Sequence, residues 1–328
     1  MILALAFSLA LADDADKPAF PIVKPGGVLF AHYGYSLTDG TDGYNEFAVD
    51  RAYVRADAQI TRRLAARITL DADRLKATDA SGALLDTKYR VFLKHAYLEV
   101  KEVLPGIKLR VGMIDTPYTP FYDAFWGNRY ISESFAKNQR LLETADLGLA
   151  VMGEHGKGLV AWNLSLLNGE GYGNVEVDAG KAVQGRVTVD PLAPSGKQGL
   201  PITGFVAYNT HAATDAATLT WAAATGYKMQ YILAWAEVLG RSEDGTSGLG
   251  YSATLNPKLP GVAGLVARYD HFDPDSSADD DGNTLLIAGL SRDWAEKVST
   301  SITYERGWTE GTPDAPAHGV FVRMQAGW

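Results

Sequence analysis

The chain has 328 residues, no cysteine and a formal net charge of −9 at pH 7. The missing cysteines exclude a disulfide scaffold and a thiolate metal site. The acidic balance argues against a nucleic-acid partner, because phosphate binding needs a basic face. Length alone favours about two soluble domains, but a large membrane barrel uses one long chain for one closed sheet.

The first twelve residues are apolar and end in Ala10-Leu11-Ala12, directly before two aspartates. This pattern predicts a secretory signal peptide over residues 1–12, although the basic region that normally opens such a peptide is missing. The alternative is a buried N-terminal strand or short helix. No other stretch approaches the roughly 20 apolar residues of a transmembrane helix. Residues 13–328 are therefore expected to form one domain.

From residue 26 onward the dominant period is two. Ala52, Val54 and Ala56 fall on one face, and Tyr53 and Arg55 fall on the other. Strict alternation marks strands with one apolar and one polar face. Breakers divide the chain into sixteen such segments, each close to the 9–11 residues of a tilted membrane strand. The expected strands are 26–37, 46–60, 63–76, 87–101, 107–115, 144–154, 157–168, 178–190, 199–210, 217–227, 229–240, 247–256, 261–272, 283–293, 297–308 and 318–328.

The connectors alternate between short and long. Residues 61–62 and 155–156 are short, whereas 38–45 and 116–143 are long. Outer-membrane barrels show this pattern, with short periplasmic turns and longer external loops. A soluble β-sandwich also has alternating strands, but its turn signals recur about every 8–12 residues. The sequence therefore predicts an all-β fold, a transmembrane antiparallel β-barrel of about 16 strands.

The fourth expected strand contains an irregularity. Its alternation slips near Lys94 and His95, which indicates a β-bulge. Tyrosine and tryptophan recur near the ends of many expected strands, as in the aromatic girdles at membrane interfaces. The alternative for these aromatic residues is a track for sugars inside the lumen.

The longest connector, residues 116–143, is expected to fold inward as the third external loop. A sixteen-stranded barrel encloses an aqueous lumen that such a loop narrows, and irregular backbone is tolerated where it lines a wet cavity. The alternative is an external loop that packs on a neighbouring subunit. The candidate constriction residues are Asp115, Tyr118, Phe121, Asp123, Trp126, Arg129 and Glu133.

A second set of candidates is basic and lies on the polar faces of the second, third, fifth and sixteenth expected strands. This basic wall consists of Arg51, Arg55, Arg67, Lys108, Arg110 and Arg323. Acidic loop groups opposite it would create a transverse field, and charged rings set ion selectivity in pores. The alternative is that about half of these cations pair with Asp57, Asp71 or Asp73 on adjacent strands and only satisfy the wall.

Motifs for other chemistry are weak. The acidic segment 270–283 invites a Ca²⁺ hypothesis, but Ala288 stands where an EF-hand places its bidentate glutamate. Residues 245–249 miss the last glycine of a G-x-S-x-G elbow, and the metalloprotease, P-loop and dinucleotide motifs are absent. We expect no enzyme, cofactor or metal. The alternatives are an outer-membrane hydrolase with a Ser–His pair on the barrel, and a secreted β-sandwich binding protein.

Several segments resemble the phosphate-selective porin O and P family of outer-membrane channels. They are residues 51–57, 95–101, 109–113, 266–273 and 301–306. The resemblance implies a homotrimeric sixteen-stranded porin in the bacterial outer membrane, reached by export through the periplasm. It implies passive diffusion of small hydrophilic solutes and ions, contact with the lipid bilayer and lipopolysaccharide, and delivery to the barrel-insertion machinery through a terminal aromatic residue. The family's basic pore arrays have no residue-by-residue match here.

Overall fold

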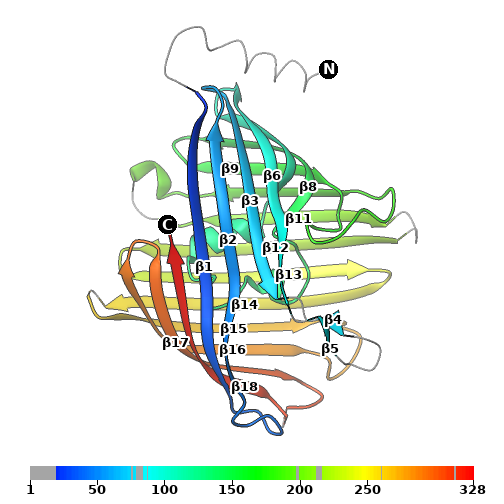
Figure 1. The fold of residues 1–328 in the computed structure, drawn as a ribbon. Helices are drawn as coiled ribbons and strands as arrows, with labels where there is room; N and C mark the ends of the chain where they lie inside the picture. The colour runs from blue at the N-terminus through cyan, green and yellow to red at the C-terminus, as the bar shows by residue number, and fades with distance from the viewer. Residues whose placement is uncertain are drawn as a thin grey trace.

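The computed structural model describes the chain from residue 20 onward, with short gaps. The described ranges are 20–74, 77–78, 84–86, 88–196, 199–211, 216–259, 261–313 and 315–328. The expected signal peptide, residues 1–12, lies outside the described residues. Within them, sixteen strands form one closed antiparallel barrel (Figure 1).

Each barrel strand pairs with its neighbours along the chain, and β1 closes the ring by pairing with β18 (Figure 1). All sixteen expected strands are present, with ends shifted by a few residues. A small separate sheet consists of β4 (Ala77–Thr78) and β5 (Leu84–Asp86). The barrel strands are β1 (Ile22–Ser36), β2 (Asn45–Gln59), β3 (Leu64–Arg74), β6 (Tyr89–Leu104), β7 (Ile107–Asp115), β8 (Ala145–His155), β9 (Val160–Leu167), β10 (Ala182–Val189), β11 (Ile202–His211), β12 (Ala216–Met229), β13 (Ile232–Glu243), β14 (Thr246–Leu259), β15 (Ala263–Asp273), β16 (Asn283–Ala295), β17 (Val298–Thr309) and β18 (Ala317–Gly327).

The two faces of the sheet are inverted relative to a water-soluble protein. On β12, Thr220 is 3% exposed, whereas its neighbour Trp221 is 39% exposed. On β14, Ser252 is buried and Tyr251 is exposed. Large exposed apolar patches are rare on soluble monomers, but an outward apolar band is the rule for a barrel in lipid. The expected alternation is thus confirmed, with the apolar face outward, and the sandwich alternative is wrong.

A β-bulge interrupts β6 at the position that the slipped alternation predicts. Thr69 of β3 pairs with His95, and the next residue of β3, Leu70, pairs with Leu93. Lys94 is therefore the extra residue of the bulge. Both Lys94 and His95 are buried, whereas Leu93 is exposed. Because a bulge re-aims side chains, two successive polar residues face inward here.

The connector between β7 and β8 contains two short helices, α2 (Thr119–Trp126) and α3 (Phe135–Asn138). Pro120 stands in the first turn of α2, where its missing N–H is tolerated. Gly127 ends this helix at a φ of 75° and donates its N–H to the Asp123 carbonyl (2.9 Å). A 3₁₀ turn, η1 (Ala193–Ser195), follows β10. Among the described residues, no helix has the length and apolar character needed to cross a membrane.

Candidate functional site

The connector of residues 116–143, which we call the inner loop, leaves and rejoins the barrel between adjacent strands. Its two ends are held together at Thr116. The backbone N–H of Thr116 donates to the Thr144 carbonyl (3.1 Å), and its hydroxyl donates to the Glu143 carbonyl (2.6 Å). Because both ends are fixed between β7 and β8, the contacts of the middle part determine its path.

The middle of the inner loop bonds to strands that are not neighbours of β7 or β8 in the barrel. These contacts involve β13, β14, β15 and β17 and use inward-facing groups. The hydrogen bonds are Tyr118 hydroxyl to Glu237 carboxylate (2.5 Å), Asn128 amide to Asn256 (2.6 Å), Arg268 guanidinium to the Glu133 carbonyl (2.6 Å) and Tyr130 hydroxyl to the Thr300 carbonyl (3.3 Å). The inner loop therefore lies against the lumenal side of this part of the wall.

Aromatic packing joins α2 to the same wall. The Tyr122 ring lies 5.7 Å from the Trp126 ring and 5.4 Å from the Trp235 ring of β13, centroid to centroid. The Arg268 guanidinium lies 5.0 Å from the centre of the Trp126 ring. Arg268 also forms an ion pair with Asp270 (2.7 Å), and both side chains are fully buried. A buried, bidentate pair of this kind holds its partners in one geometry.

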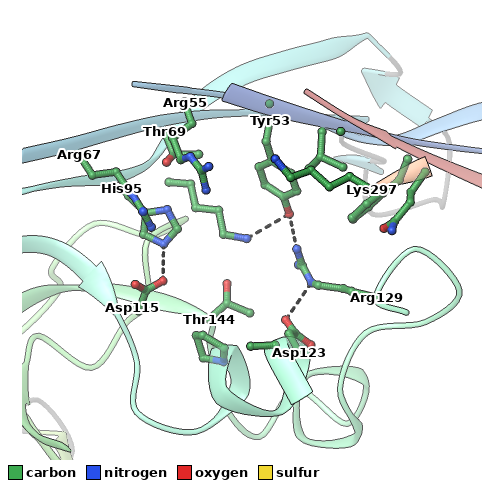
Figure 2. A pocket seen from close by; sticks show the side chains of 18 of the residues that line it. Tyr53, Arg55, Arg67, Thr69, His95, Asp115, Asp123, Arg129, Thr144 and Lys297 are labelled. Atoms are coloured by element: carbon green, nitrogen blue, oxygen red, sulfur yellow. Dashed lines mark hydrogen bonds and ion pairs between the residues drawn. The ribbon is translucent and has the colours of Figure 1, made fainter. Parts of the chain in front are cut away.

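A cavity of about 590 Å³ lies between the inner loop and the lumenal faces of β1, β2, β3, β6 and β18 (Figure 2). We call it the central cavity. Among its charged lining residues the cations outnumber the carboxylates, and apolar groups such as Val28 and Phe30 also line it. Asp115 and Asp123 contribute carboxylates. The cationic lining residues are Arg55, Arg67, Lys94, Arg129 and Lys297.

One hydroxyl joins the inner loop to the wall. The Tyr53 oxygen accepts from Nη1 of Arg129 on the inner loop (2.5 Å) and from Nζ of Lys94 on β6 (3.1 Å), as Figure 2 shows for Arg129. The same Lys94 ammonium lies 4.7 Å from the centre of the Tyr53 ring. Two cations thus share one neutral acceptor, which concentrates positive charge at this point.

Three of the expected wall cations pair with the aspartates that the sequence offers as alternatives. Arg51 contacts Asp71 (3.1 Å) and Asp73 (3.0 Å). Arg55 and Arg67 share one carboxylate, that of Asp57, at 2.9 and 2.6 Å, and both line the central cavity. For these two, pairing does not remove the excess charge, because two guanidinium groups face a single carboxylate.

The remaining expected wall cations lie outside the central cavity. Arg110 pairs with Glu99 (2.7 Å) and Asp115 (2.9 Å), and Arg323 pairs with Glu305 (2.5 Å). Lys108 is exposed and forms no ion pair with any residue that the structure describes. The sequence pattern assigns all six cations to polar strand faces, but only Arg55 and Arg67 of them line the central cavity.

The acidic residues expected at the constriction do not all lie on the inner loop. Contrary to expectation, Asp115 does not face the basic wall from the inner loop. It ends β7 and contacts Arg110 (2.9 Å) and His95 (2.9 Å) within that wall, because the inner loop begins one residue later. Asp123 contacts Arg129 of its own loop (3.0 Å) and lines the central cavity.

Glu133 is the carboxylate that connects the inner loop to a wall cation. It lies 3.0 Å from Arg129 and 3.4 Å from Arg51. Burial alone would raise the pKa of Glu133, but these two guanidinium groups hold that pKa below its ordinary value. Burial raises the pKa of Asp123, with Arg129 opposing the rise. The two loop carboxylates therefore respond differently to acid.

The expected aromatic residues of the inner loop serve as anchors. Tyr118 and Trp126 are buried against the β13–β15 wall. Phe121 lies 6.0 Å from Trp235, with the Arg186 guanidinium 4.1 Å from its ring centre. Sequence reasoning missed Thr69, Thr144 and Lys297 in the cavity and Arg268 on the far wall. The slipped alternation at Lys94 was the only sequence signal for the cavity's most buried cation.

The described residues also bear on the aromatic girdle, the Ca²⁺ site and the Ser–His pair that the sequence suggested. Many outward aromatic side chains are exposed, as a girdle requires, among them Tyr208, Tyr227 and Trp294. Within 270–283, Asp275 accepts from Ser277, and the described residues of this segment include no trio of carboxylates close enough to share a metal ion. The rings of His271 and His318 contact the hydroxyls of Thr284 and Tyr304.

Comparison with known proteins adds the fold but no close relative. No protein family model and no curated protein matches the sequence. The chain is similar to the structure of Salmonella typhi OmpF in complex with daunomycin, with a TM-score of 0.69 and 9% identity over 94% of this chain and 100% of that chain. It is also similar to the anion-selective porin from Comamonas acidovorans, with a TM-score of 0.66 and 11% identity over 94% and 100%.

A further similar structure is the trimer form of OmpT, an outer membrane protein of Vibrio cholerae. The TM-score is 0.67 and the identity 13%, and the alignment covers 94% of this chain and 100% of that one. Near-complete coverage of both chains means that the whole barrel is shared. At such low identity, the likeness supports the fold of a closed antiparallel barrel alone, and the function has to be argued from the site.

Proposed function

We propose that this chain is a porin of the bacterial outer membrane that passes small hydrophilic solutes and ions by passive diffusion, with the inner loop as its constriction and a preference for anions. The observation that carries the proposal is the lining of the central cavity. Arg55, Arg67 and Lys94 lie on the wall and Arg129 on the inner loop, against the carboxylates of Asp115 and Asp123. Charged groups at the narrowest point set ion selectivity in pores.

The net charge of −9 does not oppose an anion preference. Much of the acidic excess lies in exposed connectors, where solvent screens charge; Asp279 and Asp280 are examples. The cavity charge acts at short range and is screened much less. The local balance at the constriction therefore decides selectivity. A shared fold with an anion-selective porin supports this direction, although the specific resemblance to phosphate-selective porins stays a prediction.

The assembly and targeting follow from the same proposal. We infer a homotrimer, with OmpT in its trimer form as a structural precedent. We also infer contact of the outward apolar band with lipid and lipopolysaccharide, export through the periplasm, and delivery to the barrel-insertion machinery. Extraction tests these inferences: the protein should require detergent, and its unboiled gel band should run as an oligomer that heat converts to a monomer.

Planar-bilayer recording tests the channel itself. With a KCl gradient, the reversal potential of the wild-type channel should indicate anion preference. Arg55→Gln combined with Arg67→Gln should shift it toward cations, because two lining charges are removed. Lys181→Gln is the matched control, since Lys181 pairs with Glu176 on an exposed connector (3.1 Å). Absence of conductance, or equal reversal potentials for R55Q/R67Q and K181Q, would contradict the proposal.

A further inference from the structure

The bulge of β6 places an unusual cation in the central cavity. Lys94 is only 5% exposed, and lysine is rarely buried without a charged partner. Among the residues that the structure describes, no carboxylate lies within ion-pair distance of its ammonium group. Its contacts are the Tyr53 hydroxyl and the faces of the Tyr53 and Tyr172 rings, at 4.7 and 5.4 Å. An ammonium group has three N–H donors, so this one retains donors for another acceptor.

Hydroxyl groups without partners line the same cavity. Thr69 is 5% exposed and Thr144 is 4% exposed, and neither hydroxyl has a hydrogen-bond partner among the described residues. Nδ1 of His95 is also unpartnered, while Nε2 of that ring lies 2.9 Å from Asp115. Figure 2 shows Tyr53, His95 and Thr144 around one opening. Buried polar groups that are left unpaired are costly, which indicates that a ligand completes them.

The chemistry of these groups indicates an anion with oxygen acceptors. The ammonium and the two hydroxyls are able to donate, and a carboxylate has about four lone-pair positions to accept them. Thr69 and His95 are paired across β3 and β6, so their side chains are neighbours on one face. Thr144 directly follows the inner loop, before β8 begins. The barrel wall and the junction between the inner loop and β8 therefore both contribute polar groups to the cavity.

Part of the lining of the cavity is apolar. Val28 and Phe30 of β1 and Pro120 and Ala124 of α2 line it. Such side chains offer no hydrogen bonds to a hydrated ion and accommodate the hydrocarbon part of an organic molecule. Ligand sites commonly combine an apolar lining with a few convergent polar groups.

We propose that Lys94, with the hydroxyls of Thr69 and Thr144, forms a binding subsite in the central cavity for small organic carboxylates that carry an apolar body. The proposal rests on the channel function proposed above and names the solute class that the constriction selects. The carboxylate binds at Lys94 and the two threonines, and the apolar body lies against Val28 and Phe30. Binding at this subsite slows the passage of other ions while it is occupied.

Benzoate is the probe, added to the wild-type channel in a planar bilayer in KCl. It should block the ion current in a saturable manner, and inorganic phosphate should block it clearly less well. Lys94→Gln should raise the half-blocking concentration of benzoate about tenfold or more, the size expected for one charged hydrogen bond. Thr144→Val should raise it roughly three- to tenfold through one neutral hydrogen bond. This second variant leaves β6 intact and keeps the test available if K94Q fails to insert.

Lys101→Gln is the matched control. Lys101 lies on the same strand, and its ammonium bonds to Gln59 (2.5 Å) outside the central cavity. This variant should block like the wild type. Equal benzoate block in wild type, K94Q and T144V would overturn the subsite, and phosphate block as strong as benzoate block would overturn the apolar half of the assignment. A channel that conducts but is not blocked by benzoate overturns this inference alone, whereas a protein without conductance overturns the proposed function.

Discussion

Two regions of the barrel wall share the same alternating pattern but differ in what their inward side chains contact. On β13–β15, inward polar groups such as Glu237 and Arg268 are covered by the inner loop and bonded to it. On β2, β3 and β6, inward groups such as Arg55, Arg67 and Lys94 face the central cavity. We call these regions the anchoring wall and the open wall. Their strands alternate alike, so the difference arises from where one connector lies.

This comparison separates stability from selectivity. A polar group under the inner loop must find a protein partner, because it has no water. A cation on the open wall lines the central cavity, where its charge acts on the permeating ion. Substitutions on the anchoring wall should therefore change unfolding and current noise, and substitutions on the open wall should change selectivity.

The largest effect is expected at the anchoring wall, for Arg268→Met. This change leaves the Asp270 carboxylate buried without its guanidinium partner and removes the bond to the Glu133 carbonyl. Loss of one partner of a buried pair costs about 3–5 kcal/mol. The midpoint of guanidinium unfolding in detergent should fall, and single-channel recordings should show a noisier, larger conductance as the inner loop loosens.

Arg241→Met on β13 serves as the control for R268M. Arg241 pairs with Glu243, and both side chains are partly exposed. An exposed pair of this kind contributes at most about 1 kcal/mol. If the two variants unfold at the same denaturant concentration, the buried pair does not hold the inner loop, and the anchoring wall has been misassigned.

An intermediate effect is expected for Tyr118→Phe. The change removes one hydroxyl and leaves Glu237, which is 3% exposed, without the donor that now lies 2.5 Å away. A buried acceptor left without a donor costs about 1–3 kcal/mol. Unfolding in detergent should show this loss, while the reversal potential stays as in the wild type. Tyr208→Phe, on the outward exposed face, should change neither quantity.

The strands follow from the sequence because alternation is a local property. The expected strand 107–115 and β7 (Ile107–Asp115) have the same bounds, and the slip at Lys94 marks the bulge. The inward direction of Arg55 and Arg67 follows from the same phase. Such features need only neighbouring residues, so the barrel strands and the inward direction of these two wall cations are predictable.

The anchoring wall is not predictable in this way, because its contacts join distant parts of the chain. The bond from Tyr118 to Glu237 spans 119 residues, and that from Arg268 to Glu133 spans 135. The alternating pattern predicts that Glu237 faces inward, but it does not predict that Tyr118 covers it. The same limit explains Asp115, whose role depends on where the inner loop turns away from β7.

A smaller effect is expected from acid, acting through Glu133. Arg129 and Arg51 hold the folded-state pKa of Glu133 below its ordinary value, so its pairing stabilises the protein above the unfolded-state pKa of about 4.3. This contribution decreases as pH falls below that value and disappears once pH passes the lower folded-state pKa. Lys137 and Lys94 act on the carboxylate in the same direction.

Glu133→Gln isolates the contribution of the Glu133 carboxylate to the free energy of unfolding, because glutamine does not titrate. At pH 7 the wild type should be more stable than E133Q by under about 1 kcal/mol, since the carboxylate is partly exposed and solvent screens the pair. The difference between the two unfolding midpoints should shrink from pH 6 to pH 3. A difference that grows with acid would mean that Glu133 is not stabilised by its guanidinium neighbours.

The smallest effect is expected for Lys108→Gln on β7. Lys108 belongs to the expected basic wall, but it is exposed and lies outside the central cavity. Exposed charges more than about 10 Å apart are screened at physiological salt, and exposed substitutions usually change stability within about 0.5 kcal/mol. Reversal potential and unfolding should therefore match the wild type. If K108Q instead shifts the reversal potential as far as R55Q/R67Q does, selectivity depends on the summed charge of the whole lumen, and the central cavity loses its special role.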